Sequence, residues 1–263
     1  MDIKFRVNPY NLNNKLIQVN DIINIMQTLN INDFKVNDLS IYQTAMVHKS
    51  YCELSEYKEF NNPGNGCLSL QKESYETLEF LGDSILGSIV SSYIYKRFNI
   101  IHHQNEGFLT KLKIRLVCGE NLYRFSKNIK LENFLIISNH IEEKCSGRNN
   151  SNILEDIFEA FIGAIYLDNN YEVVENFLIK VIEKHADFTE ILLKDNNYKD
   201  QISRYMQQNF KLYPKYETTK VGEIFQSKIL KEDNIITVAE GSSKKKAEQE
   251  VSKKALIHFN VIT

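Results

Sequence analysis

The sequence lacks the signals for crossing or entering a membrane. No stretch approaches the roughly 18 apolar residues of a membrane-spanning helix. The N-terminus, MDIKFRVNPYNLNNK, has no apolar run of the kind found in signal peptides. The cysteines show neither CxxC spacing nor the density of a disulfide framework, so reduced thiols are expected at Cys52, Cys67, Cys118 and Cys145. These absences predict an intracellular protein of the cytoplasm, with the nucleus left open.

Several common site motifs are missing as well. The six histidines show no zinc-binding spacing with cysteine, so we assign them no metal. The chain has neither a phosphate-binding P-loop nor a serine nucleophile motif. The chemistry of this protein must therefore be sought in other residue types.

The chain also lacks a large net charge, because its formal charge is only −2. That value alone does not suggest a nucleic-acid binder, but the distribution does. From Asn197 onwards 12 Lys and Arg stand against 8 Asp and Glu, whereas the preceding part carries 20 against 26. This asymmetry predicts two domains with different roles.

The order of apolar and polar residues divides the chain further, and 263 residues suit one large and one small domain. Residues 1–30 are interpreted as an extension with one short helix after Asn20. Residues 31–194 are predicted to form an all-α domain. Within it, the polar stretch 51–72 contains NNPGNG and is expected to be a surface loop. Residues 195–263 comprise a linker and a second domain.

The second domain is predicted to be a small α+β unit. An amphipathic helix with Ile202, Met206 and Phe210 on its apolar face comes first. Three short strands follow, in KYETTKV, QSKILKE and NIITVAE, joined by tight connections. A last helix begins after GSS. The expected order is therefore α-β-β-β-α.

An acidic stripe runs along the segment YETLEFLGDSILGSIVSSYIY. Glu76, Glu79 and Asp83 fall within an arc of about 60° on a helix that is apolar over most of its surface. Carboxylates at this spacing repel one another, and burying them without partners costs several kcal/mol each. No Lys or Arg lies between positions 73 and 95 to compensate them. Either a cation comes from elsewhere, or the acids line a solvated edge.

A second apolar helix with an acidic pair is predicted in NILEDIFEAFIGAIYLD. Asp156 and Glu159 are three residues apart, and Glu155 beside them is expected to point elsewhere and be solvated. Ala160 and Gly163 are small enough to allow close approach of a neighbouring helix. Two such helices could pack together so that their acidic stripes face each other.

Together the two stripes would gather Glu79, Asp83, Asp156 and Glu159 in one place. Oxygen ligands without His or Cys suit Mg²⁺ or Mn²⁺. That setting serves metal-assisted phosphodiester hydrolysis, in which metal activates the attacking water and stabilises the leaving oxygen. The alternative, two unrelated solvated edges, remains open at this point.

These motifs resemble a known family. YETLEFLGDSIL is similar to the ribonuclease III signature, and ILEDIFEAFIGAIYLD to the second acidic motif of that family. Between them NEGFLTKLKIRLVCG resembles the connecting segment, and AMVHKS matches the region before the signature. The resemblance covers about residues 31–259. It implies a ribonuclease III endonuclease fold and cleavage of double-stranded RNA, leaving 5′-phosphate ends and short 3′ overhangs.

The resemblance also implies roles for single residues. The catalytic metal ligands, for Mg²⁺ with Mn²⁺ as substitute, would be Glu79, Asp83, Asp156 and Glu159. Glu76 and Glu106 would assist RNA binding or the outer metal shell. Members of the family form homodimers, and Phe80 holds the place of the interface aromatic, although an ordinary core Phe is the alternative. Tyr75 and Thr77 depart from the Asn and Arg of the family pattern.

The C-terminal unit resembles a double-stranded-RNA-binding domain, which reads the shape of A-form RNA. Three lysines, Lys244, Lys245 and Lys246, begin its last helix, where bound phosphate would offset their repulsion with the helix dipole. A solvated charge run is the alternative. Ser203 and Arg204 stand where bacterial members often have Gln and Glu. The first strand connection, around 222–224, is short and lacks a His for the minor groove.

Two functions from another class compete with the nuclease. One is a non-catalytic protein that binds and sequesters double-stranded RNA, and the other is a structural homologue associated with the ribosome. Loss of a ligand carboxylate would favour either of them. The sequence retains all four, which favours the endonuclease.

Overall fold

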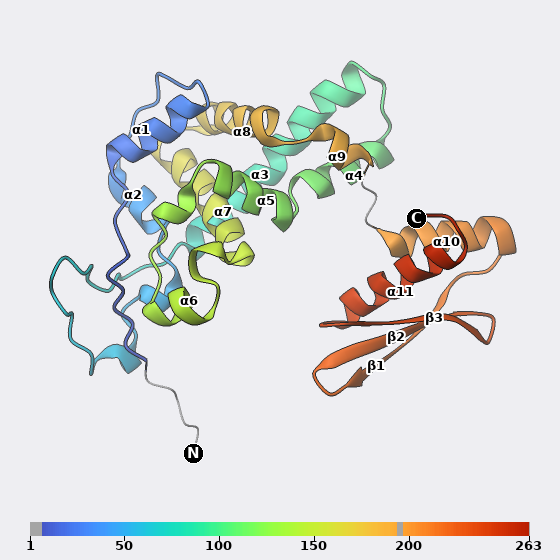
Figure 1. The fold of residues 1–263 in the computed structure, drawn as a ribbon. Helices are drawn as coiled ribbons and strands as arrows, with labels where there is room; N and C mark the ends of the chain where they lie inside the picture. Colours follow the sequence, from blue (N-terminus) through green and yellow to red (C-terminus); the bar gives the residue numbers. More distant parts are fainter. Residues whose placement is uncertain (1–6, 194–196, 263) are drawn as a thin grey trace. The chain divides into compact units, whose positions relative to one another are not determined.

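The chain forms two compact units, residues 1–191 and residues 192–263, which are drawn in Figure 1. The computed structural model describes residues 7–193 and 197–262. The linker expected at 195–197 falls mostly outside the described residues. Each unit has a hydrophobic core of its own.

The first unit is helical, as predicted. Its α-helices are α1 (Val19–Thr28), α2 (Leu39–Thr44), α3 (Glu76–Ile94), α4 (Glu106–Leu116), α5 (Gly119–Asn128), α6 (Asn139–Lys144), α7 (Ser151–Asp168), α8 (Tyr171–His185) and α9 (Phe188–Leu193). A π-helical turn at Tyr95–Ile100 continues α3. No helix in the described ranges is long and apolar enough to span a membrane.

Helices α3 and α7 cross in the middle of this unit (Figure 1). Helix α7 begins where the Asn150 side chain accepts hydrogen bonds from the amides of Asn152 and Ile153. Most of its surface is apolar, and Leu154, Phe158 and Phe161 are fully buried. A helix buried on nearly every side must place any carboxylate that it carries against a neighbouring element.

The N-terminal segment packs into the first unit. Ile17, Ile22 and Met26 are fully buried in its core. Helix α1 begins at Val19 and so includes Asn20, because the Gln18 amide donates to the Asp21 carboxylate at 2.9 Å and starts the helix earlier than predicted.

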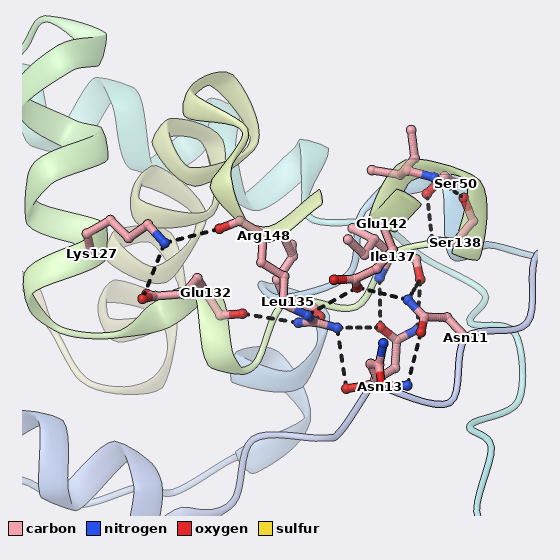
Figure 2. A network of polar contacts seen from close by, with 12 residues as sticks. Asn11, Asn13, Ser50, Lys127, Glu132, Leu135, Ile137, Ser138, Glu142 and Arg148 are labelled. Carbon is pink, nitrogen blue, oxygen red and sulfur yellow. Dashed lines mark hydrogen bonds and ion pairs between the residues drawn. The ribbon is translucent and has the colours of Figure 1, made fainter. Parts of the chain in front are cut away.

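A polar network fastens this segment to the chain that precedes α7 (Figure 2). The Arg148 guanidinium lies 3.1 Å from Glu142 and donates to the carbonyl oxygens of Glu132 and Leu135. Asn11 donates to the carbonyl of Ile137 at 3.1 Å and to Glu142 at 3.0 Å. The network thereby fixes the loops that lead into the second acidic helix.

The second unit has the predicted α-β-β-β-α order. It consists of α10 (Tyr198–Phe210), β1 (Lys215–Val221), β2 (Ile224–Lys231), β3 (Asn234–Gly241) and α11 (Lys244–His258). The strands form one antiparallel sheet in the order β1-β2-β3, and both helices lie on one side of it (Figure 1). The short connection predicted after β1 is a tight turn at 222–223, where Gly222 has a φ of +64°.

Candidate active site

The first acidic stripe lies at the beginning of α3. Helix α3 starts at Glu76, directly after Tyr75. Glu76 and Asp83 are exposed, whereas Glu79 is partly buried toward α7. The helix dipole favours Glu76 and Glu79 in the first turn, so local structure accounts for part of the pattern.

Two glycines let α3 and α7 approach closely. A Cβ atom on Gly82 would lie 1.8 Å from the backbone oxygen of Glu159, and one on Gly163 would lie 2.4 Å from the backbone oxygen of Leu78. No side chain fits at either position without moving a backbone. The sequence indicated the small residue on α7 but not Gly82, its counterpart beside Asp83. This close crossing brings the two stripes together.

The carboxylates of the two helices share one electrostatic environment. Burial, together with the charges of neighbouring carboxylates, raises the pKa of Glu159 to about 8. Those charges belong to Asp83, Glu155, Glu79 and Asp156. Burial is also the main cause that raises the pKa of Glu79 and of Asp156. Such a group of anions favours a bound cation.

One cation beside the first stripe comes from the segment before α3. Lys49 lies 3.0 Å from Glu76, with both side chains more than half exposed. Its charge also lowers the pKa of Glu79 and of Asp156, against the effect of burial. Lys49 was not identified from the sequence, because its partner is 27 positions away and no local pattern links them.

A buried phenol reaches the second stripe. Tyr75 donates a hydrogen bond from its hydroxyl to Asp156 Oδ2 at 2.9 Å. The prediction that Glu155 is solvated was wrong, because this residue is partly buried and its carboxylate lies against the start of α5. A Cβ atom on Gly119, at the start of α5, would lie only 2.2 Å from Glu155 Oε2. Burial therefore raises the pKa of Glu155.

Known proteins identify the fold that carries this geometry. Residues 38–185 match the family model described as Ribonuclease-III-like, and residues 198–258 match the double-stranded RNA binding motif. The chain is 34% identical to ribonuclease 3 of Zunongwangia profunda over 227 residues, which cover 84% of this chain and 85% of that protein. The chain belongs to the ribonuclease III family. It is an endoribonuclease that acts on double-stranded RNA.

Two further ribonuclease III relatives show where the likeness extends. A probable ribonuclease 3 of Acanthamoeba polyphaga mimivirus is 38% identical over 236 residues, covering 87% of this chain. This chain spans only 39% of the length of that relative. The nuclease domain of ribonuclease III from Campylobacter jejuni superposes with a TM-score of 0.50 at 27% identity, covering 63% of this chain and 98% of that domain.

The predicted ligands of this ribonuclease III lie on facing helices but do not yet converge. Among the described residues, no group of three or more His, Cys, Asp and Glu side chains is close enough to hold one metal ion. The neighbouring carboxylates nevertheless add to the effect of burial in raising the pKa of Glu159. In chemistry and charge the set fits a hard divalent ion, because every donor is a carboxylate oxygen.

The other residues expected at the nuclease site have varied surroundings. Phe80 is 78% exposed, so it does not belong to the core of the unit. Glu106 is exposed at the start of α4, where it accepts a hydrogen bond from Thr110 at 2.7 Å. Glu106 is therefore on a different helix from the two acidic stripes.

The remaining RNA-binding candidates lie on the two helices of the second unit. Lys244, Lys245 and Lys246 are exposed in the first turn of α11, which the Ser243 side chain caps by accepting from the Lys246 amide. Arg204 lies on α10 beside Asp200 at 2.9 Å, and the neighbouring Ser203 is partly buried.

Proposed function

We propose that this ribonuclease III binds Mg²⁺, with Mn²⁺ as substitute, through Glu79, Asp83, Asp156 and Glu159. The observation that carries the proposal is the close crossing at Gly82 and Gly163, which brings the two acidic stripes onto neighbouring helices. Burial and the nearby carboxylates raise the pKa of Glu159 to about 8. A bound divalent ion would activate the attacking water and stabilise the leaving oxygen. The products would carry 5′-phosphates and short 3′ overhangs.

The side chains of this chain have distinct parts in such a site. Glu79 and Glu159 would bind the ion from opposite helices, α3 and α7, whose backbones approach closely at Gly82 and Gly163. Lys49 holds Glu76 at the rim by the ion pair of 3.0 Å. We assign Glu76 and Glu106 to RNA binding or to the outer metal shell.

We further propose that the enzyme works as a homodimer through Phe80. A large aromatic side chain with 78% of its surface exposed, on the helix that carries three of the acids, supports an interface there. The nuclease domain of the Campylobacter jejuni enzyme is described as having structural flexibility in a region involved in dimer formation, which supports the same arrangement for this chain.

The second unit would supply most of the affinity for duplex RNA. Lys244, Lys245 and Lys246 are exposed at a helix start, where amides and ammonium groups together attract phosphate. Ser203 and Arg204 would contact RNA from α10. We also place the enzyme inside the cell, because Cys52, Cys67, Cys118 and Cys145 are free thiols.

Replacing Glu159 with Gln tests the ligand assignment. The variant keeps the shape of the side chain but removes its charge, so cleavage of duplex RNA should fall by more than about 100-fold while duplex binding stays nearly intact. Glu155→Gln is the matched control, since it removes a partly buried carboxylate from the same helix. We expect at most a few-fold loss there. Full activity of Glu159→Gln would refute the assignment.

A further inference from the structure

Tyr75 occupies a fixed position between the segment 47–50 and α3. Its amide donates to the carbonyl of Val47 at 2.8 Å, and its own carbonyl accepts from the Glu79 amide at 2.9 Å in the first turn of α3. Its ring is tilted against that of His48, with the centroids 5.8 Å apart. Only 3% of Tyr75 is exposed. The backbone hydrogen bonds, the contact with His48 and the burial together restrict the orientation of the Tyr75 side chain.

In this orientation the Tyr75 hydroxyl points toward α7. The Tyr75 hydroxyl donates to Asp156 Oδ2 at 2.9 Å, which links residues 81 positions apart. The bond uses one oxygen of the carboxylate. An isolated Asp on a helix has several rotamers of similar energy, so a donor held from the opposite side selects one of them.

We propose that Tyr75 is a positioning residue of the active site, whose hydroxyl fixes the orientation in which the Asp156 carboxylate receives a divalent ion. The proposal rests on the assignment of Asp156 as a metal ligand. It gives a role to a position where the sequence departs from the Asn of the family pattern. A hydrogen-bonded carboxylate loses less rotational freedom when it binds an ion, which strengthens binding.

The chain contains a matched control for this contact. Tyr42 is fully buried and donates from its hydroxyl to Asp168 Oδ2, also at 2.9 Å. Asp168 is the last residue of the same helix, α7, and it also accepts from the amides of Asn37 and Asp38. Tyr42→Phe therefore removes the same kind of bond at the far end of α7, away from the acidic stripes.

The experiment compares Tyr75→Phe, Tyr42→Phe and wild type as full-length, metal-free proteins titrated with Mn²⁺ and followed by electron paramagnetic resonance of the free ion. Tyr75→Phe should raise the Kd for Mn²⁺ by about 10-fold, and Tyr42→Phe should leave it unchanged. Both variants should lower the metal-free Tm, because each loses the hydrogen bond that its hydroxyl donates to an Asp of α7. Tyr42→Phe also loses the bond that the Asn169 side chain donates to the Tyr42 hydroxyl at 3.4 Å, so its Tm should fall at least as far. The Mg²⁺ concentration for half-maximal cleavage should rise only for Tyr75→Phe, with kcat recovering at saturating Mg²⁺.

The possible outcomes distinguish the role of Tyr75 from the assignment of the metal ligands. An unchanged Kd for Tyr75→Phe, with wild type binding Mn²⁺ and Glu159→Gln not, would overturn the inference and leave the ligands in place. Equal weakening by Tyr75→Phe and Tyr42→Phe would also overturn it, because general loosening of α7 would then be the cause. If wild type bound Mn²⁺ no better than Glu159→Gln, the proposed function itself would fail.

Discussion

At the scale of single residues, the carboxylate of Glu159 is held where a negative charge is unfavourable. Burial is the largest cause, and four neighbouring carboxylates add to it. Ionisable groups whose charged form is disfavoured by burial and by neighbouring like charges are typical of functional sites. A bound cation would reverse this effect, because its charge would stabilise the ionised form of Glu159.

This conflict predicts how the stability of the metal-free protein depends on pH. Glu159 titrates near 4.5 in the unfolded chain and near 8 in the folded one, so the folded state binds the proton more tightly. The stabilisation is complete below about pH 4.5 and is lost as the pH rises through about 8. After allowance for solvent screening, the free energy of unfolding should fall by on the order of 2 kcal/mol over this range.

Urea unfolding in EDTA at a series of pH values measures this dependence. Glu159→Gln cannot ionise at this position and should flatten the curve between about pH 5 and pH 8. Added Mg²⁺ should restore stability mainly at the alkaline end, where it no longer competes with a proton. Parallel curves for the wild type and the Gln variant would show that Glu159 is not perturbed as the structure indicates.

At the scale of elements, the active site depends on how closely two helices cross. Ala at position 82 would place its Cβ 1.8 Å from the backbone oxygen of Glu159, so α3 and α7 would have to separate. Gly82→Ala should therefore destabilise the protein by about 1–3 kcal/mol, as overpacking does elsewhere, and should weaken Mn²⁺ binding.

Gly87 on the same helix provides the control for this crossing. A Cβ atom there would have as its nearest neighbour Lys113 Nζ at 3.8 Å, an ordinary contact. Gly87→Ala should be neutral or stabilise the helix by up to about 1 kcal/mol. Thermal unfolding with and without Mn²⁺ distinguishes the two variants. Equal stability of both would mean that the close crossing is not required.

The sequence predicted the elements better than the contacts between them. The strands and both helices of the second unit followed from periodicity and turn residues, and β1 matches KYETTKV residue for residue. The acidic stripes followed from helical spacing. The contacts of Lys49 and Tyr75 could not be predicted, because their partners are 27 and 81 positions away and only the fold brings them together. The partial burial of Glu155 was missed because a projection of α7 alone does not show that α5 packs against this residue.

At the scale of the whole molecule, the exposed Phe80 predicts self-association. The side chain is 78% exposed in the single chain, so Phe80→Ala should leave the fold of the subunit unchanged. Truncating an aromatic at the centre of an interface often costs about 2 kcal/mol or more, so the dimer should dissociate at roughly 30-fold higher concentration. Leu12→Ala, at 64% exposure, controls for loss of an exposed apolar side chain.

Sedimentation velocity over a range of protein concentrations measures this association. Wild type and Leu12→Ala should sediment as dimers at concentrations where Phe80→Ala sediments as a monomer. A monomeric wild type, or an equally stable dimer of Phe80→Ala, would contradict the role that we propose for this residue.

The most direct test of the metal-dependent nuclease is cleavage of a long, generic RNA duplex by the full chain in Mg²⁺, Ca²⁺ or EDTA. We expect duplex products with 5′-phosphates in Mg²⁺, binding with little turnover in Ca²⁺, whose bonds are longer and geometry looser, and no cleavage in EDTA. Cleavage that persists in EDTA would contradict the metal centre at Glu79, Asp83, Asp156 and Glu159. Tight duplex binding without cleavage in Mg²⁺ would show a binding protein instead of a nuclease.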